Sequence, residues 1–228
     1  MSQINEPNNK LEVVEKTIGF LSRIKKYIII GVPVLIIAIT AVVVIYAIKD
    51  STANKAMARI IQIEELLMDN SISTDETVQS PSADIIQELD SLVQQDSKWI
   101  SAKAAVLLAG IYTIEKDWSK AVDILDAVNI EKASYLAPVV LFNAGSISEE
   151  MGDADKALQF YERCDTLYRN SFPEAPRVIF AIARIQEIKK STDKAIEQYN
   201  LLIDTWPEDD FSSMARTRLI ALDATKGE

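Results

Sequence analysis

The side chains that could do chemistry in this chain are mainly carboxylates. Its 228 residues include 34 aspartates and glutamates, no histidine, and a single cysteine, Cys164. Paired carboxylates can act as an acid and a base, or bind calcium, where a fold brings them together. Without histidine the chain lacks the commonest general base and the commonest metal ligand. Its composition therefore gives little support to hydrolytic or zinc-dependent mechanisms.

The carboxylate groups stand where helix physics accounts for them. They include Glu149–Glu150, Asp153 with Asp155, and the run 208–210. Asp153 and Asp155 open a predicted helix and Asp209 precedes another, and helix N-termini favour anionic side chains. No stretch has the spacing of a calcium loop. We therefore expect no catalytic residue, no metal site and no cofactor. An enzyme with an unrecognised acidic site is the alternative, and it would need convergent carboxylates with perturbed pKa values.

The other reactive or aromatic side chains fit packing better than binding. Cys164 falls at a small-residue position facing a neighbouring helix, with no histidine to activate it, so we expect a buried thiol. Trp118, Tyr112, Tyr161 and Tyr199 fall at predicted core positions. The glycines are isolated, so no phosphate-binding loop is indicated.

Charge is unevenly distributed along the sequence. The segment 1–27 holds five basic and three acidic side chains, a net charge of +2. Because the whole chain has a net charge of −10, the remaining residues carry −12. An acidic domain is repelled by phosphate backbones. We therefore expect no nucleic-acid binding. A single cysteine excludes an intramolecular disulfide but does not decide between compartments.

Residues 28–48 form an uncharged apolar segment. Fourteen of its side chains are isoleucine, valine or leucine. As a helix the segment would be about 30 Å long, which matches the hydrocarbon core of a bilayer. At about −0.4 kcal/mol for each of these side chains, insertion is favoured by about 6 kcal/mol. A cleaved signal peptide has a shorter apolar core and small residues at its end, so the sequence predicts one transmembrane helix.

The basic residues predict how this helix is oriented. Five precede the segment, including the cluster Arg23, Lys25 and Lys26, and three follow it closely. The excess predicts a cytoplasmic N-terminal tail over residues 1–27 and a large domain on the other side. Residues 9–21 have helical periodicity, and they either extend the span or form a separate amphipathic helix against lipid or a partner. In a bacterium the large domain would be periplasmic, with the chain anchored in the inner membrane.

Three segments of the large domain repeat one pattern. Residues 102–128, 138–164 and 176–202 each contain a predicted helix, a short polar turn and a second helix. The small residues of the second helices align at Ala121, Ala157 and Ala195. Their spacing is close to the length of a tetratricopeptide repeat, which is about 34 residues. The sequence therefore resembles the tetratricopeptide-repeat family, which implies an all-α solenoid of stacked helical hairpins.

Further helices are expected on either side of the three repeats. Residues 49–97 are expected to form a helical stalk and a degenerate first hairpin, interrupted by a polar loop at 69–82. The three repeats and a capping helix, from about Asp210 to Leu222, occupy residues 98–228. In the cap we expect Met214, Leu219 and Leu222 to pack and Arg216 and Arg218 to face solvent.

Architecture along nearly the whole chain resembles the YfgM-like ancillary subunits of the bacterial Sec translocon. The stretch DSKWISAKAAVLLAGIYTIEKDWSKAVDIL, residues 96–125, carries most of this likeness. The third repeat is more similar to periplasmic scaffolds of division and outer-membrane assembly. The resemblance implies a non-catalytic adaptor whose span contacts a membrane complex such as the Sec translocon and whose repeats bind chaperones or client polypeptides. The alternative is a scaffold for cell-envelope or division complexes.

The tetratricopeptide resemblance also implies a binding groove lined by the first helix of each repeat. Phe142 and Phe180 are the strongest candidate anchors if they are exposed, because aromatic residues dominate interface energetics, and the alternative is burial against the next repeat. The positions that map to the groove are Lys103, Val106, Gly110, Thr113, Val139, Phe142, Ser146, Glu149, Arg177, Phe180, Arg184 and Glu187.

Overall fold

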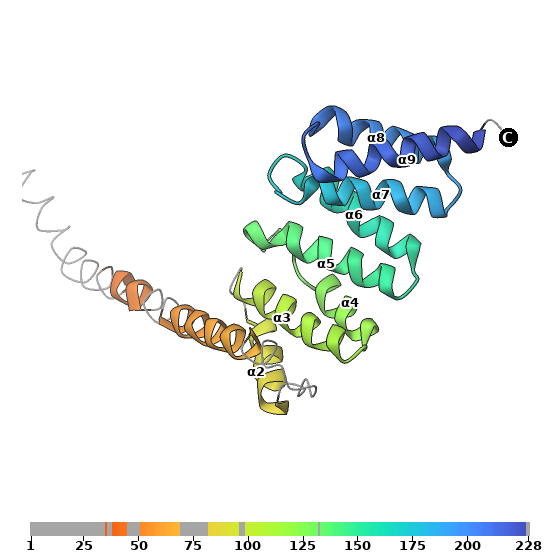
Figure 1. Cartoon of the computed structure of the whole chain (residues 1–228). Coiled ribbons are helices and arrows are strands. Elements are labelled where there is room, and N and C mark those ends of the chain that lie inside the picture. Colours follow the sequence, from red (N-terminus) through yellow and green to blue (C-terminus); the bar gives the residue numbers. More distant parts are fainter. Residues whose placement is uncertain are drawn as a thin grey trace, which may run out of the picture. The chain divides into compact units, whose positions relative to one another are not determined.

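The computed structural model describes residues 35, 38–44, 51–68, 82–95, 99–131 and 133–226. The chain divides into two compact units, Met1–Lys55 and Ala56–Glu228. In the first unit the described residues, 35, 38–44 and 51–55, are helical. The second unit holds the labelled helices, drawn from yellow to blue in Figure 1.

Several sequence predictions fall on residues outside this description. They are the tail over 1–27, most of the span at 28–48, and the loop at 69–82 except Ser82. Among the described residues, no helix is both long enough and apolar enough to cross a membrane.

The second unit is a stack of antiparallel helix pairs, and every regular element in its described part is helical. The prediction of an all-α tetratricopeptide-like solenoid is therefore confirmed, and Figure 1 shows the pairs layered in chain order. A short 3₁₀ turn, Ser134–Leu136, precedes the second repeat. The helices are α2 (Ala83–Val93), α3 (Ile100–Ile114), α4 (Trp118–Asp126), α5 (Ala137–Glu150), α6 (Ala154–Tyr168), α7 (Ala175–Ile188), α8 (Thr192–Thr205) and α9 (Asp210–Lys226).

The first helix of each repeat ends in the same turn. Lys116, Gly152 and Lys190 have φ values of 62°, 77° and 58°, in the left-handed region that glycine adopts most easily. In the second repeat the Gly152 N–H donates to Glu149 O at 2.8 Å and the next N–H donates to Ser148 O at 2.9 Å. This pair of bonds is a Schellman motif, which satisfies carbonyls at the helix end. The same turn forms in the other two repeats with lysine in place of glycine.

Small residues allow the two helices of each hairpin to approach closely. Ala121, Ala157 and Ala195 are fully buried, as their alignment predicts. In the second repeat α5 contributes Gly145, where an added Cβ would lie 2.6 Å from a ring carbon of Tyr161. Tyr161 is itself only 2% exposed. The hairpin is therefore closed by a tyrosine that packs against a glycine.

Residues 56–68 and α2 pack at the start of the second unit. Ile60 and Ile63 are fully buried, as is Leu89 on α2. The Arg59 guanidinium donates two hydrogen bonds to the Glu88 carboxylate, at 2.7 and 2.8 Å. This contact holds the pKa of Glu88 below its usual range. The Arg59–Glu88 pair thus joins two helices that each bury apolar side chains.

The capping helix α9 begins at the expected residue, Asp210. The prediction that Met214 packs is wrong. Met214 is 49% exposed, whereas Phe211, Leu219 and Leu222 pack against the core cluster that contains Tyr199. Spacings of four and three residues place the buried Ala215 and these three side chains on one helix face, which leaves Met214 outside it.

Candidate functional site

A pocket of about 180 Å³ lies where the second repeat, the third repeat and the capping helix meet. Four of its nine lining residues are aromatic, and the first helices add charged groups. The residues that line it are Phe142, Ser146 and Glu149 from α5, Tyr161 from α6, Arg177, Phe180, Ala181 and Arg184 from α7, and Phe211 from α9.

Six of the twelve groove positions line this pocket. Phe142 and Glu149 come from the second repeat, and Arg177, Phe180 and Arg184 from the third. They converge because side chains three, four or seven residues apart share one face of a helix. Ser146, which also maps to the groove, lies between Phe142 and Glu149 on that face.

The other candidates have contacts of their own. The Lys103 ammonium pairs with Glu64 at 2.5 Å, so it is bound to the helix that precedes the repeats. Val106 packs against the main core cluster, and the Thr113 hydroxyl donates to Ala109 O at 2.8 Å. Val139 is half-buried, and Gly110 is exposed with nothing within 4 Å of where a Cβ would lie. These residues do not join the pocket.

A cluster of three polar side chains joins the second repeat to the third. The Tyr161 hydroxyl donates to the Glu149 carboxylate at 3.2 Å, and Arg184 donates to its two oxygens at 2.5 and 2.7 Å. Burial and the adjacent Glu149 carboxylate raise the pKa of Tyr161 above its usual range, so the phenol remains a donor. This charge-assisted pair therefore links α7 to α5 directly.

The same cluster recurs between the third repeat and the cap. The Tyr199 hydroxyl donates to Glu187 at 2.5 Å, and Arg218 pairs with the same carboxylate. Burial alone would raise the pKa of Glu187, but the hydrogen bonds from Arg218 and Tyr199 outweigh it, so the pKa lies below its usual range. Arg218 remains 49% exposed, so the prediction that it faces solvent holds only in part.

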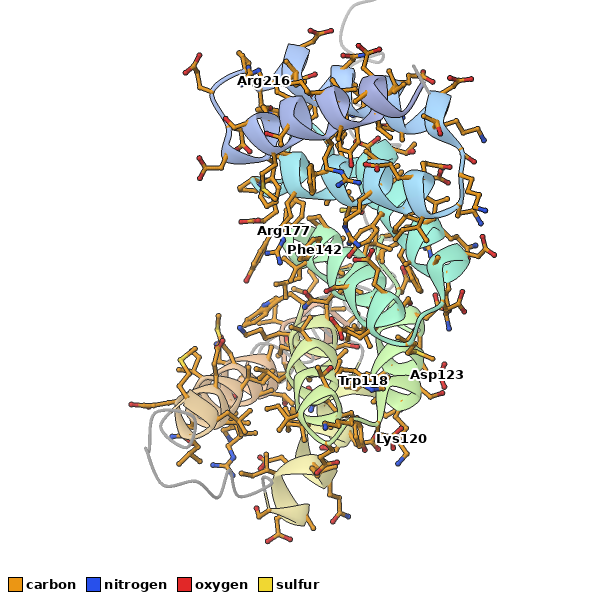
Figure 2. The ribbon with its side chains drawn as sticks, turned by 45° about the vertical axis from the view of Figure 1, so that its right-hand side comes forward. Trp118, Lys120, Asp123, Phe142, Arg177 and Arg216 are labelled. Carbon is orange, nitrogen blue, oxygen red and sulfur yellow. The ribbon has the colours of Figure 1, made fainter. Side chains whose placement is uncertain are left out.

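The two candidate aromatic anchors differ in exposure. Phe180 is only 9% exposed, with Tyr199 and Phe211 each at a ring-centroid distance of 5.6 Å. Phe142 is half-buried, and the Arg177 guanidinium lies 4.9 Å from its ring centroid. Figure 2 shows Phe142 and Arg177 side by side where α5 meets α7. Of the alternatives that the sequence left open, burial therefore applies to Phe180, whose ring is covered by the cap.

The acidic groups and the cysteine have structural contacts. The carboxylates of Asp153 and Asp209 accept backbone N–H bonds at 3.0 and 2.8 Å, and Asp155 pairs with Lys189. Cys164 is buried, its thiol lies 3.6 Å from Pro138 O, and burial raises its pKa to about 12. Within the described ranges, no three acidic or cysteine side chains are placed to hold a metal ion.

Comparison with known proteins identifies the repeat. Residues 138–171, which span α5 and α6, match the family model of the tetratricopeptide repeat. A "TPR repeat-containing protein" of Treponema pallidum (strain Nichols) is 29% identical over 127 residues, 55% of this chain and 52% of that protein. The chain thus spans about half the length of this relative.

Two crystal structures of MamA are also similar to this chain. They have TM-scores of 0.44 and 0.43 at 21% identity, and the matches cover 55% and 52% of this chain. They cover 64% and 65% of the MamA chains.

Residues 138–171 therefore match a tetratricopeptide repeat, and they lie within a stack of similar helical hairpins. Such arrays present extended surfaces to protein partners. The match to the family model falls on the repeat that supplies Phe142, Ser146, Glu149 and Tyr161 to the pocket.

Sequence reasoning did not identify three participants in these contacts: Tyr161, Phe211 and Arg218. A signal was present, because the seven-residue spacing of Phe142 and Glu149 recurs in Phe180 and Glu187 of the next repeat. Each glutamate also has an arginine on the next groove helix or the cap, since Glu149 pairs with Arg184 and Glu187 with Arg218. The recurrence of an aromatic and a carboxylate at one spacing indicates that both pairs meet the next helix in the same way.

Proposed function

We propose that this protein is a non-catalytic, membrane-anchored adaptor whose repeats bind other polypeptides. The observation that carries the proposal is the pocket at which two repeats and the cap present aromatic side chains and arginines together. Aromatic and arginine side chains dominate the energetics of protein interfaces. Convergence of these residue types on the groove helices favours recognition of a protein over catalysis.

The anchor in this proposal is the helix over residues 28–48. The described residues within it are helical, and Leu35, Ile39, Val42, Val43 and Val44 are 49–60% exposed. Large apolar side chains exposed on an uncharged helix suit a lipid environment. With more basic residues before this helix than after it, the N-terminus would be cytoplasmic and the repeats would lie in the periplasm of a bacterium.

The partner that we favour is a complex of the inner membrane, with the Sec translocon first and a chaperone or client polypeptide in the groove. A helix that crosses the membrane once can dock beside a membrane complex, while a solenoid reaches a second partner outside the bilayer. The alternative is a scaffold of cell-envelope or division complexes, because the sequence of the third repeat resembles such scaffolds. Both versions share the groove and differ in the complex beside the helix.

Photocrosslinking in native membranes tests the proposal. Crosslinkers would be placed within residues 28–48, at Val139 on the groove side of α5, and at the exposed Asp123 of α4 as a control. We expect the first two positions to capture defined proteins and Asp123 to capture none of them. Capture of Sec subunits from the helix would support the translocon, and capture of division or assembly proteins would support the alternative. Equal capture from all three positions would contradict the adaptor.

A protease experiment tests the orientation. Protease added to spheroplasts should digest the repeat domain, because the basic flank predicts that the domain lies outside the cytoplasm. Protection of the domain in intact spheroplasts, with digestion only after lysis, would reverse the proposed orientation.

A further inference from the structure

The pocket has the size of a single side chain. Pockets for drug-sized ligands and cofactors measure about 300–1,000 Å³. This one measures about 180 Å³, and its rings include Phe142, Tyr161 and Phe211. A large apolar side chain of a partner would bury its surface against these rings. The volume therefore favours one residue of a polypeptide over a free small molecule.

The charges around the pocket do not cancel. Arg184 and Glu149 neutralise each other across their contacts of 2.5 and 2.7 Å. Arg177 is exposed, stacks on Phe142, and pairs with no carboxylate among the described residues. The two arginines and one glutamate of the lining leave a net +1 in a chain of net charge −10. A carboxylate is therefore attracted to this position on a protein that otherwise repels acidic surfaces.

Arg177 is also held in position for such a contact. Its guanidinium lies over the Phe142 ring, at 4.9 Å from the centroid, with its donors still accessible to solvent. Arginine binds a carboxylate through two parallel hydrogen bonds, and stacking on an aromatic face leaves those donors free. Figure 2 places Arg177 and Phe142 together and Arg216 well away from them on α9.

We propose that this pocket recognises a peptide segment in which a large apolar side chain stands beside an aspartate or glutamate. The apolar side chain fills the aromatic pocket, and the carboxylate pairs with Arg177. This inference rests on the proposed adaptor function and specifies the chemistry of its partner. It distinguishes the pocket from a general apolar groove, because an apolar residue without the neighbouring carboxylate binds more weakly.

Selection from a displayed library of random peptides tests the inference. The baits would be the full-length protein in detergent micelles, the charge-reversal variant Arg177→Glu, and Arg216→Glu as a control. Both substitutions change the net charge equally, and Arg216 does not line the pocket. We expect the wild type and Arg216→Glu to enrich an apolar residue beside an acidic one. Arg177→Glu should enrich an apolar residue beside lysine or arginine, a gain that a misfolded variant cannot produce.

A binding titration then measures the contribution of the charge. The enriched peptide, labelled with fluorescein, would be compared with its analogue in which the acidic residue is glutamine. We expect about tenfold weaker binding of the glutamine peptide to the wild type, as for loss of a hydrogen bond to a charged group. Binding of the two peptides to Arg177→Glu should differ much less.

Other results would overturn the inference in distinguishable ways. If the wild type enriched apolar residues without an acidic neighbour, or if Arg177→Glu enriched the same sequences as the wild type, the pocket would not be the site that recognises the carboxylate. The adaptor function would be unaffected by either result. Self-association of the wild type that Arg177→Glu abolishes, measured by light scattering, would make a second copy the occupant instead. No enriched peptide from any bait would reject the inference, and the adaptor would fall only if photocrosslinking also captured no partner.

Discussion

Replacement of Gly145 by alanine should strain the second repeat, because the new methyl group meets the Tyr161 ring. The added Cβ would lie 2.6, 2.8 and 2.9 Å from three ring carbons, and the ring is buried, with its hydroxyl bonded to Glu149. Overpacking of a core costs about 1–3 kcal/mol. Alanine in a helix interior gains about 0.8–1.0 kcal/mol over glycine. The expected net loss in the free energy of unfolding is about 0–2 kcal/mol.

Gly110 provides a matched control for this substitution. It lies inside α3 and is exposed, and an added Cβ there has nothing within 4 Å. Gly110→Ala should therefore stabilise the domain by about 0.8–1.0 kcal/mol, the difference in helix propensity between the two residue types. The difference between the two variants removes the propensity contribution and leaves the cost of the contact with Tyr161.

Comparison with the third repeat gives a narrower range for the difference in free energy of unfolding between Gly145→Ala and Gly110→Ala. Ala183, at the position that matches Gly145, accompanies Tyr199, so a hairpin with a tyrosine can hold a methyl group there when its neighbours adjust. We therefore expect about 1–2 kcal/mol between the two variants, in the lower part of the overpacking range. Urea unfolding of a fragment spanning 51–228, followed by circular dichroism, would measure it. Equal stabilisation by both substitutions would refute the close packing of Gly145 on Tyr161.

Three further predictions concern the same fragment. Ala157→Leu should lower the free energy of unfolding by about 1–3 kcal/mol because Ala157 is fully buried, and half-buried Ala154→Leu should lower it much less; equal urea midpoints would contradict the repeat register. Lys116→Gly should stabilise the first repeat by about 0.5–1 kcal/mol, because φ there is positive, and a lower thermal midpoint would count against this turn geometry. Glu187 has a lowered pKa in the folded state, so its stabilising effect is complete above the usual value of 4.5 and is lost as pH falls through the lowered pKa. Glu187→Gln should thus lose less stability than the wild type on acidification below about pH 5 in denaturation experiments, and parallel pH profiles would exclude this role.

The sequence was sufficient for features that depend on spacing along the chain. The alanines at 121, 157 and 195 recur at nearly equal intervals, and that interval predicted the hairpins and their turns. The residue types at 116 and 190 did not indicate a turn, because a left-handed conformation is usually signalled by glycine and both positions are lysine. These two turns were predicted from the length of the repeat and not from the residue found at the turn.

The candidate site depends on contacts between repeats, which spacing does not determine. Whether Phe180 is exposed depends on Phe211, which lies on the far side of α8 in the chain. Pairing of Arg218 with Glu187 likewise requires the angle at which α9 crosses α7. Helical periodicity places a residue on a face but does not say what covers that face. The groove candidates could therefore be named, but the pocket could not.

A glutamate–arginine pair joins the capping helix to α7 as another joins α7 to α5, so the array could grow by duplication of a unit. Phe211 and Arg218 on the cap have the same seven-residue spacing as Arg177 and Arg184 on α7. A second copy of residues 176–209, inserted before α9, would give Arg184 and Arg218 each a glutamate partner from the preceding unit. It would also place another arginine beside another phenylalanine, because repeats contact only their neighbours. Lengthening a gene by one such unit would thus repeat the contact between successive repeats without requiring a new interface to evolve, while Phe211 would move with the cap from the present pocket to the new terminal unit.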